Sequence, residues 1–208
     1  MNNFLQQGLT KYLETTELSK IKNTKILIAG AGGVGSNAAM LLVRCGFEKI
    51  TIIDYDELEP SNLNRQFFFN EQVGTLKVCG LKENLLKINH QATITIIKER
   101  LTVDNVNNLI KNQDIILEAF DDIIAKKIIV EACHLLAKHI IAVSGIAGIG
   151  NSDKIVIRKI NNRFYMVGDF ESDINLALPP LAPKVMIAAA KQVDIVLELV
   201  IGNKEIVR

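Results

Sequence analysis

The stretch KILIAGAGGVG, residues 25–35, decides the fold class of this 208-residue chain. A short, mostly apolar run enters a cluster of four glycines, and residues 34–45 then follow the period of a helix. Such a run is typical of a buried strand in a parallel sheet. Glycines let backbone N–H groups approach a phosphate, and the N-terminus of the following helix favours anionic charge. The stretch therefore predicts a strand–turn–helix unit that binds a nucleotide.

The rest of the chain continues the alternation of strands and helices. Strand patterns occur at 49–54, 92–98, 114–120 and 139–143, and helix patterns at 74–89, 104–110, 123–137 and 185–201. Two short segments, 154–159 and 163–167, indicate an antiparallel pair. This order predicts an α/β fold: a Rossmann-like, mostly parallel sheet with helices on both faces and a small antiparallel C-terminal addition. No linker or repeat divides the chain, so we expect residues 1–208 to form a single domain.

The glycine turn matches the G-x-G-x-x-G pattern with an added glycine. Its members are Gly30, Gly32, Gly33 and Gly35. Asp54 ends the second predicted strand, where a carboxylate can accept hydrogen bonds from ribose hydroxyls. This combination predicts nucleotide binding but does not choose between NAD(P), FAD and ATP.

The segment DYDELEPSNLNRQ, residues 54–66, narrows the chemistry. Residues 56–72 form a long connection for a compact domain, and such loops are usually functional. A dehydrogenase needs no polar arm ending in Arg-Gln at this point. Asp56 and Asn62 could still be ordinary loop residues, and Arg65 could be a surface residue packed over the aromatic rings at 67–69.

The order of these motifs resembles the ubiquitin-activating-type adenylating enzymes, a family that includes ThiF, MoeB and HesA. The matching pieces are GAGGVG at 30–35, DYD at 54–56, SNLNRQ at 61–66, VGTLK at 73–77, EAFDD at 118–122 and Ser-Gly at 144–145. The resemblance covers roughly residues 25–150. Several motifs in the right order are far more specific than the glycines alone.

The resemblance implies a role for each matching residue. The four glycines, Asp54, Asp56 and Ser61 would line the nucleotide site, with Asp54 on the ribose. Asn62 and Arg65 would contact the phosphates, Lys77 would neutralise them, and Asp121 would bind Mg²⁺ or orient the reacting phosphate. Asp122 stands where the family often has Asn and would lie near the nucleotide. As structural alternatives, Lys77 could be a surface lysine at a helix start and Asp121 the N-cap of the next helix.

The final helix pattern suggests a branch of the family. The segment PKVMIAAA at 183–190 is similar to the short, thiamine-pathway ThiF branch. This likeness implies ATP- and Mg²⁺-dependent adenylation of the C-terminal Gly carboxylate of a small ubiquitin-like sulfur carrier protein (ThiS-like), with release of pyrophosphate. Three alternatives stay open: a relative acting on a molybdenum-cofactor carrier or a modified tRNA, an NAD(P)-dependent oxidoreductase, and a binding module that holds the nucleotide as a structural ligand. Family members are usually homodimers, so a homodimer is expected.

Composition excludes several other classes. A net charge of +1 argues against nucleic acid as the main ligand.

Three cysteines without CxxC spacing predict no zinc site and no disulfide framework, and fit a reducing cytoplasm. No Cys follows residue 144, so no covalent enzyme–carrier intermediate is expected. The start of the chain has no signal-peptide pattern, and residues 185–201 are too charged to span a membrane. Residues 1–24 contain no Arg, whereas many members of the family supply an arginine there.

Overall fold

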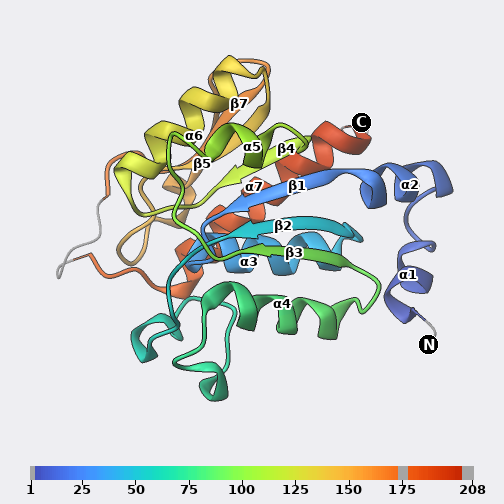
Figure 1. Ribbon diagram of the computed structural model, residues 1–208, viewed down its shortest axis with the longest axis horizontal. Coiled ribbons are helices and arrows are strands. Elements are labelled where there is room, and N and C mark those ends of the chain that lie inside the picture. Colours follow the sequence, from blue (N-terminus) through green and yellow to red (C-terminus); the bar gives the residue numbers. More distant parts are fainter. Residues whose placement is uncertain (1–2, 173–177, 203–208) are drawn as a thin grey trace.

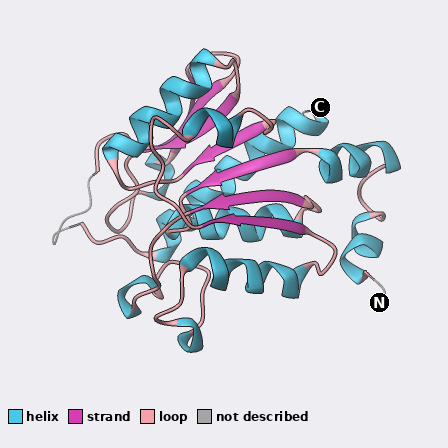
Figure 2. Ribbon diagram, viewed as in Figure 1, coloured by secondary structure: helices cyan, strands magenta, loops and turns pink. Residues whose placement is uncertain are grey.

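The computed structural model describes residues 3–172 and 178–202, and this part of the chain forms one seven-stranded sheet. The strand order is β3-β2-β1-β4-β5-β7-β6, with helices on both faces (Figures 1 and 2). The strands are β1 (Lys25–Ala29), β2 (Lys49–Ile53), β3 (Thr93–Ile97), β4 (Ile115–Glu118), β5 (His139–Val143), β6 (Val156–Lys159) and β7 (Phe164–Gly168). The helices are α1 (Phe4–Leu9), α2 (Thr15–Asn23), α3 (Gly33–Arg44), α4 (Lys77–Ile88), α5 (Val106–Ile110), α6 (Ile123–Leu135) and α7 (Ala182–Ile201). The predicted Rossmann-like fold class is confirmed.

The central strands are parallel, and their order reverses at β1. β1 pairs with β2 on one side and with β4 on the other, so the chain leaves β1 in one direction and returns on the opposite side. In open sheets of this kind, ligands bind at the carboxyl ends of the strands, at the point of reversal. The predicted antiparallel pair, β6 and β7, is also confirmed. It extends the same sheet, because β7 pairs in parallel with β5.

Alternate residues of β1 supply the two halves of the core. Ile26 and Ile28 pack into the cluster built by α3, α4 and α7, whereas Leu27 and Ala29 pack into the cluster built by α5 and α6. This is the two-residue period of a strand that is covered on both faces. α7 lies against α3 with a buried stripe that includes Val185, and it therefore belongs to the core.

Some element boundaries differ from the sequence predictions. α4 begins at Lys77, not at 74, because Gly74 has φ +85° and lies in the left-handed region. α7 begins at Ala182, not at 185, because Pro183 fits the first turn of a helix. α1 and α2 were not predicted. Each has a local capping bond instead of a clear apolar period: the Asn3 side chain accepts from Gln6 N–H at 3.1 Å, and α2 has a capping box.

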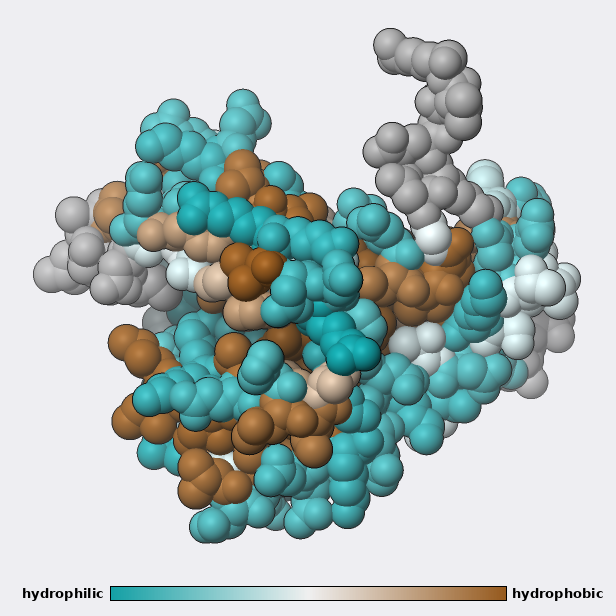
Figure 3. Space-filling view, turned by 90° about the horizontal axis from the view of Figure 1, so that it is seen from above, coloured by the Kyte–Doolittle hydropathy of each residue, from teal (hydrophilic) through white to brown (hydrophobic). Residues whose placement is uncertain are grey.

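The surface carries hydrophobic patches between hydrophilic ones. On the face seen from above, brown and teal regions alternate (Figure 3). α6 contributes exposed hydrophobic residues, among them Ile123, Ile124 and Leu135. Within the described residues, no helix combines the length and hydropathy needed to cross a membrane.

Candidate functional site

The glycine turn lies directly against the end of β4. Gly30 has φ +102°, and a Cβ at this position would lie 2.8 Å from the Ala119 carbonyl oxygen. A Cβ at Gly35 would lie 1.8 Å from the Gly30 carbonyl oxygen. At the start of α3, Ser36 N–H donates to Gly32 O at 3.0 Å, which is the first hydrogen bond of the helix. The backbone N–H groups before Ser36 have no acceptor within the helix. A first turn of this kind offers backbone donors and positive partial charge to an anion.

Asp54 ties β2 to the glycine turn. Its Oδ2 accepts from Ala31 N–H at 2.6 Å, and its Oδ1 accepts from Asp56 N–H at 2.8 Å. Burial raises the pKa of Asp54, and the two backbone hydrogen bonds and the charge of Lys77 oppose this rise. Each carboxylate oxygen keeps a second acceptor position, so the side chain can still accept from ribose hydroxyls.

Lys77 and Asp56 form an ion pair across the base of the 56–72 loop. Lys77 Nζ lies 2.8 Å from Asp56 Oδ2, and the Lys77 side chain is 9% exposed. Lys77 N–H also donates to Asp56 O at 2.9 Å, so the first residue of α4 is held at both ends. An ammonium has three protons, and this ion pair uses one of them.

Arg65 lies over the glycine turn, and the charge of Asp121 acts on it. Arg65 Cδ lies 3.6 Å from the position that a Cβ on Gly33 would occupy. Burial lowers the pKa of Arg65, and the charge of Asp121 opposes that shift. Arg65 Nη1 donates to Ser61 O at 3.0 Å and to Asn64 Oδ1 at 2.8 Å. The Arg65 side chain thus lies beside the N-terminus of α3, and Asp121 supplies an opposite charge that acts on it from a different loop.

Asp122, not Asp121, caps α6. The Asp122 Oδ1 accepts from Ile124 N–H at 2.8 Å, which is the N-cap bond that the sequence could have given to Asp121. Asp121 is exposed, and none of the hydrogen bonds found in the described residues involves its side chain. Its carboxylate is therefore available to a ligand.

Two further predicted residues take part in the loop itself. Asn62 is buried, and its Oδ1 accepts from Glu59 N–H at 3.1 Å, which closes a short 3-10 turn (Pro60–Asn62). Ser61 is exposed, and its hydroxyl donates to Glu59 at 3.3 Å. Their predicted contact with the nucleotide stays a prediction.

Several residues that position the site were missed by the sequence analysis. Asn37 Nδ2 donates to Gly33 O at 2.7 Å and to Arg65 O at 2.8 Å, and Ser36 Oγ accepts from Phe67 N–H at 3.0 Å. The first turns of α3 therefore hold the Arg65 segment in place. Gln66 is also buried there, and its Oε1 has no hydrogen-bond partner in the described residues. The sequence did offer one signal for Asn37: it is a polar residue two positions after the last glycine of the turn, inside an otherwise mostly apolar helix.

A buried amide pair fixes the 56–72 loop on α4. Asn84 Nδ2 donates to Phe67 O at 3.0 Å and to Gln72 Oε1 at 2.9 Å. Gln72 Nε2 donates to Gly80 O at 3.2 Å. The loop is thus an ordered part of the site, because its backbone carbonyls have partners in the helix below.

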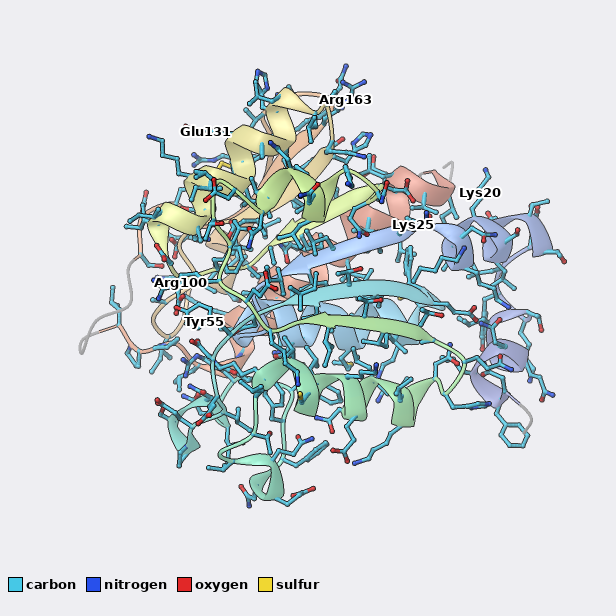
Figure 4. All side chains as sticks on the ribbon, in the orientation of Figure 1. Lys20, Lys25, Tyr55, Arg100, Glu131 and Arg163 are labelled. Carbon is cyan, nitrogen blue, oxygen red and sulfur yellow. The ribbon has the colours of Figure 1, made fainter. Side chains whose placement is uncertain are left out.

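A second missed pair lies on the nucleotide side of the carboxyl edge. Tyr55 and Arg100 lie together there, opposite Lys20 and Lys25 at the other end of the molecule (Figure 4). Arg100 Nη2 donates to Tyr55 OH at 2.6 Å. This bond, followed by the charges of Asp122 and Asp56, raises the pKa of Arg100.

A buried ion pair anchors the strand that carries Asp121. Lys126 Nζ contacts Glu118 Oε1 at 2.9 Å and Oε2 at 3.0 Å, and donates to Val143 O at 3.0 Å. Glu118 Oε1 also accepts from Phe120 N–H at 2.7 Å. Burial raises the pKa of Glu118, while Lys126 lowers it. The pair joins the ends of β4 and β5 to α6.

The cysteines and the acidic residues offer no metal cage. Cys45, Cys79 and Cys133 are free, and burial raises the pKa of Cys133 to about 12. Cys45 follows the last residue of α3, and both Cys45 and Cys79 are partly buried. No group of three His, Cys, Asp or Glu in the described ranges could hold a metal ion.

One cavity lies away from these residues. It has a volume of about 900 Å³ and lies beside the last turn of α6 and the starts of β5 and β7. Its lining includes Val130, Leu135, Ile140 and Phe164. The glycine turn lies at the opposite, carboxyl edge, so this cavity is no part of the candidate site.

Comparison with known proteins gives matches over the whole fold. A family model described as the ThiF family matches residues 6–205. The chain is 35% identical over 128 residues to the adenylyltransferase and sulfurtransferase MOCS3 of Aedes aegypti, covering 61% of this chain and 29% of that protein. It is 36% identical over 132 residues to the adenylyltransferase and sulfurtransferase UBA4 of Candida albicans, covering 63% and 30%. The match thus spans less than a third of these curated relatives.

A solved structure shows the same fold. The E. coli tRNA N6-threonylcarbamoyladenosine dehydratase TcdA, in complex with ATP, superposes with a TM-score of 0.85. The superposition covers 93% of this chain and 92% of TcdA at 21% sequence identity. At this level of identity the likeness is one of fold.

Proposed function

This chain belongs to the ThiF family, and from that premise we propose that it adenylates the C-terminal carboxylate of a small ubiquitin-like carrier protein with ATP. The observation that carries the proposal is the position of the Arg65 side chain beside Gly33, where the charge of Asp121 also acts on it. A glycine turn alone also fits an NAD(P)-dependent oxidoreductase. An oxidoreductase reaction would leave the presence of Arg65, Lys77 and Asp121 unexplained.

Adenylation of a carboxylate by ATP requires neutralisation of the phosphate charge, but it requires no strong base. A terminal carboxylate is already ionised at neutral pH. One of its oxygens attacks the α-phosphorus, the bond from that phosphorus to the β-bridging oxygen breaks, and pyrophosphate leaves with the bonding electrons. The products are an acyl adenylate and pyrophosphate.

The residues of the site fit these needs. The first-turn amides of α3 would hold phosphate oxygens. Arg65 would donate to the phosphates in a bidentate manner, and Lys77 would supply a compact positive charge to the leaving pyrophosphate. Asp54 would accept from the ribose, and Asn62 and Ser61 would contact the phosphates from the loop. Bringing two anions together in this way is the main task of the protein.

The available carboxylate of Asp121 fits Mg²⁺. Magnesium is usually bound by one or two carboxylates together with substrate phosphates, so it needs no cage of protein ligands. Asp122 takes the α6 cap and leaves Asp121 exposed. Asp121 would therefore hold Mg²⁺, which when bound would neutralise phosphate charge.

The substrate is best assigned as a sulfur carrier protein. The curated relatives are named as both adenylyltransferases and sulfurtransferases, which supports a carrier that receives sulfur after adenylation. Within that class we propose a ThiS-like carrier ending in Gly-Gly, in thiamine biosynthesis. A molybdenum-cofactor carrier and a modified tRNA are the competing substrates.

We also propose a cytoplasmic homodimer. Three free thiols fit a reducing compartment. The exposed Ile123, Ile124 and Leu135 on α6 are apolar surface that a second copy could cover. Sedimentation at several protein concentrations would test the dimer, and a monomer at all of them would remove it.

Exchange of radiolabelled pyrophosphate into ATP tests the proposed reaction. We expect exchange that requires Mg²⁺ and a carrier ending in Gly-Gly, because formation of the acyl adenylate is reversible. A carrier lacking the last glycine pair is the control. Tight NAD(P) binding with no exchange for ThiS-like and molybdenum-cofactor carriers would overturn the proposal.

A further inference from the structure

Lys184 is a buried lysine at the start of α7. It is the third residue of the helix and is 9% exposed. Its Nζ donates to Ala147 O at 2.9 Å, and no other partner for it is found in the described residues. An ammonium can donate three hydrogen bonds. A buried charge is costly unless it is compensated, so an ammonium with donors to spare suits a site for an anion.

The first turn of α7 lies beside the candidate site. Val185 Cγ1 lies 3.0 Å from the position that a Cβ on Gly33 would take, next to the stem of Arg65. Asn64 Nδ2 donates to Pro180 O at 3.2 Å, so the 56–72 loop also contacts the segment that leads into α7. Lys184 is thus held at the carboxyl edge, close to the glycine turn.

The loop after β5, beside Lys184, contains glycines whose backbone is not covered by side chains of their own. Lys184 Nζ lies 3.8 Å from the position of a Cβ on Gly148, whose φ is +84°. Gly145, with φ +74°, precedes it in the same loop. A Cβ at Gly145 would lie 2.1 Å from Asp169 Oδ1, so the loop packs closely on the end of β7. A loop built from glycines can approach an extended peptide closely.

Asp169, a carboxylate on which the charge of Lys184 acts, is occupied by backbone donors. Asp169 Oδ1 accepts from Glu171 N–H at 3.0 Å and from Ser172 N–H at 2.8 Å. Burial raises the pKa of Asp169, but these bonds and the charge of Lys184 outweigh it and lower the pKa. In the described residues the two side chains form no direct ion pair within 4.0 Å. The charge of Lys184 is therefore only partly offset.

We propose that the Lys184 ammonium binds the carboxylate that is to be adenylated and makes the site specific for a free carboxylate. This inference rests on the proposed function. Arg65 and Lys77 would serve the phosphates, whereas Lys184 precedes Val185, the α7 residue that lies next to Gly33, and places its ammonium beside Gly148. The Lys184 ammonium would pair with the carrier carboxylate, and this lowers the electrostatic repulsion between that carboxylate and the phosphates of ATP. A neutral carboxamide would gain nothing from this charge.

The test compares two forms of one substrate. A ThiS-like carrier ending in Gly-Gly and the same protein with a C-terminal carboxamide are titrated into the enzyme with Mg²⁺ and α,β-methylene-ATP. We expect the native enzyme to bind the carboxylate form about 10- to 100-fold more tightly, the range for a hydrogen bond to a charged group. In Lys184→Met this preference falls to less than about threefold, while the affinity for the ATP analogue is unchanged.

Two further variants separate the charge from the fold. Lys184→Gln can still donate to Ala147 O but has no charge, so we expect it to lose the preference and keep the native thermal transition. Lys191→Gln is the control, because Lys191 lies on the same helix and donates to Ile155 O. It should keep the full preference.

Each outcome bears on a different claim. A folded Lys184→Gln enzyme that still prefers the carboxylate would overturn the assignment of Lys184 and leave adenylation in place. Absence of carrier-dependent pyrophosphate exchange in the native enzyme would remove the proposed function, and the inference with it.

Discussion

Gly35 has almost no room for a side chain. The calculated Cβ position lies 1.8 Å from the Gly30 carbonyl oxygen, which belongs to the backbone of the same turn. This oxygen cannot move away without displacing β1 or the end of β4. The glycine therefore fixes both the packing of α3 and the shape of the phosphate site.

We expect Gly35→Ala to lower the free energy of unfolding by about 3 kcal/mol and to weaken ATP binding, because overpacking forces the backbone to shift. Urea unfolding and ATP titration would measure the two effects. Gly8→Ala is the matched control, since a Cβ at Gly8 meets nothing within 4 Å and Gly8 lies inside α1. It should be neutral or stabilising by up to about 1 kcal/mol. Equal losses in both variants would contradict the steric argument.

Arg65 and Asp121 should affect turnover far more than stability. We expect Arg65→Ala and Asp121→Ala each to reduce pyrophosphate exchange by about 100-fold or more, since each removes a charge that acts on the phosphates. Their thermal transitions should stay close to the native value, because Arg65 is only partly buried and Asp121 is exposed. Glu131→Ala, an exposed position on α6 that lies apart from Tyr55 and Arg100 (Figure 4), is the control. Near-native exchange in either site variant would remove its catalytic assignment.

At the scale of elements, a single ion pair joins β4, β5 and α6. Glu118 ends β4, Lys126 lies in the second turn of α6, and Val143 O ends β5. Asp121 and Asp122 lie between the two charged residues in sequence. The pair therefore helps to set where these two acidic residues lie.

Lys126→Met should destabilise the protein in a pH-dependent way. Leaving Glu118 buried without its partner should cost about 3 kcal/mol at neutral pH. The folded pKa of Glu118 lies above its ordinary value of 4.5, and loss of Lys126 raises it further. A raised carboxyl pKa gives stability that is present below the unfolded pKa and lost as pH rises through the folded pKa. The deficit should therefore be larger at pH 8 than at pH 5.

Urea unfolding across this pH range would measure the deficit. The double variant Glu118→Gln, Lys126→Met is the control, because it has no carboxyl group to titrate at this position. We expect its deficit to be smaller and nearly independent of pH. A single variant whose deficit did not change with pH would show that Glu118 is not the group responsible.

At the scale of the whole molecule, the site joins segments from most of the chain. The glycine turn follows β1, Asp54 follows β2, Lys77 begins α4, Asp121 follows β4 and Lys184 begins α7. A ligand that contacts all of these should stabilise the fold as a unit, because it binds the folded state and not the unfolded one.

We expect Mg²⁺-ATP to raise the thermal transition, with a gain of about 2.7 kcal/mol at a hundredfold excess over its dissociation constant. NAD(P)H at the same concentration should leave it unchanged. Asp54→Asn should weaken the response to ATP, since Asp54 contacts both the glycine turn and the predicted ribose position. A larger shift with NAD(P)H than with ATP would favour the oxidoreductase instead.

The sequence by itself determined the fold class and predicted where the candidate site lies. Residues 25–35 carry both a strand period and the glycines of a tight turn, and these are local properties that do not depend on distant contacts. The same holds for the alternation of strands and helices, which predicts parallel pairing and therefore a site at the carboxyl edge. The sequence did not predict α1 and α2, because the feature that identifies the start of each helix is a side-chain capping bond and not an apolar period.

Only the tertiary structure decided which side chains meet there. Sequence allowed Asp121 to be either a cap or a ligand, and the cap bond from Ile124 to Asp122 removed the first of these roles. It could not show that Asn37 holds the Arg65 segment or that Lys184 is buried beside Gly148. These partners lie far apart along the chain, so their contacts depend on how α3, α7 and the loops pack. Local patterns report which face of an element is buried, whereas the identity of its partner follows from the packing of the whole sheet.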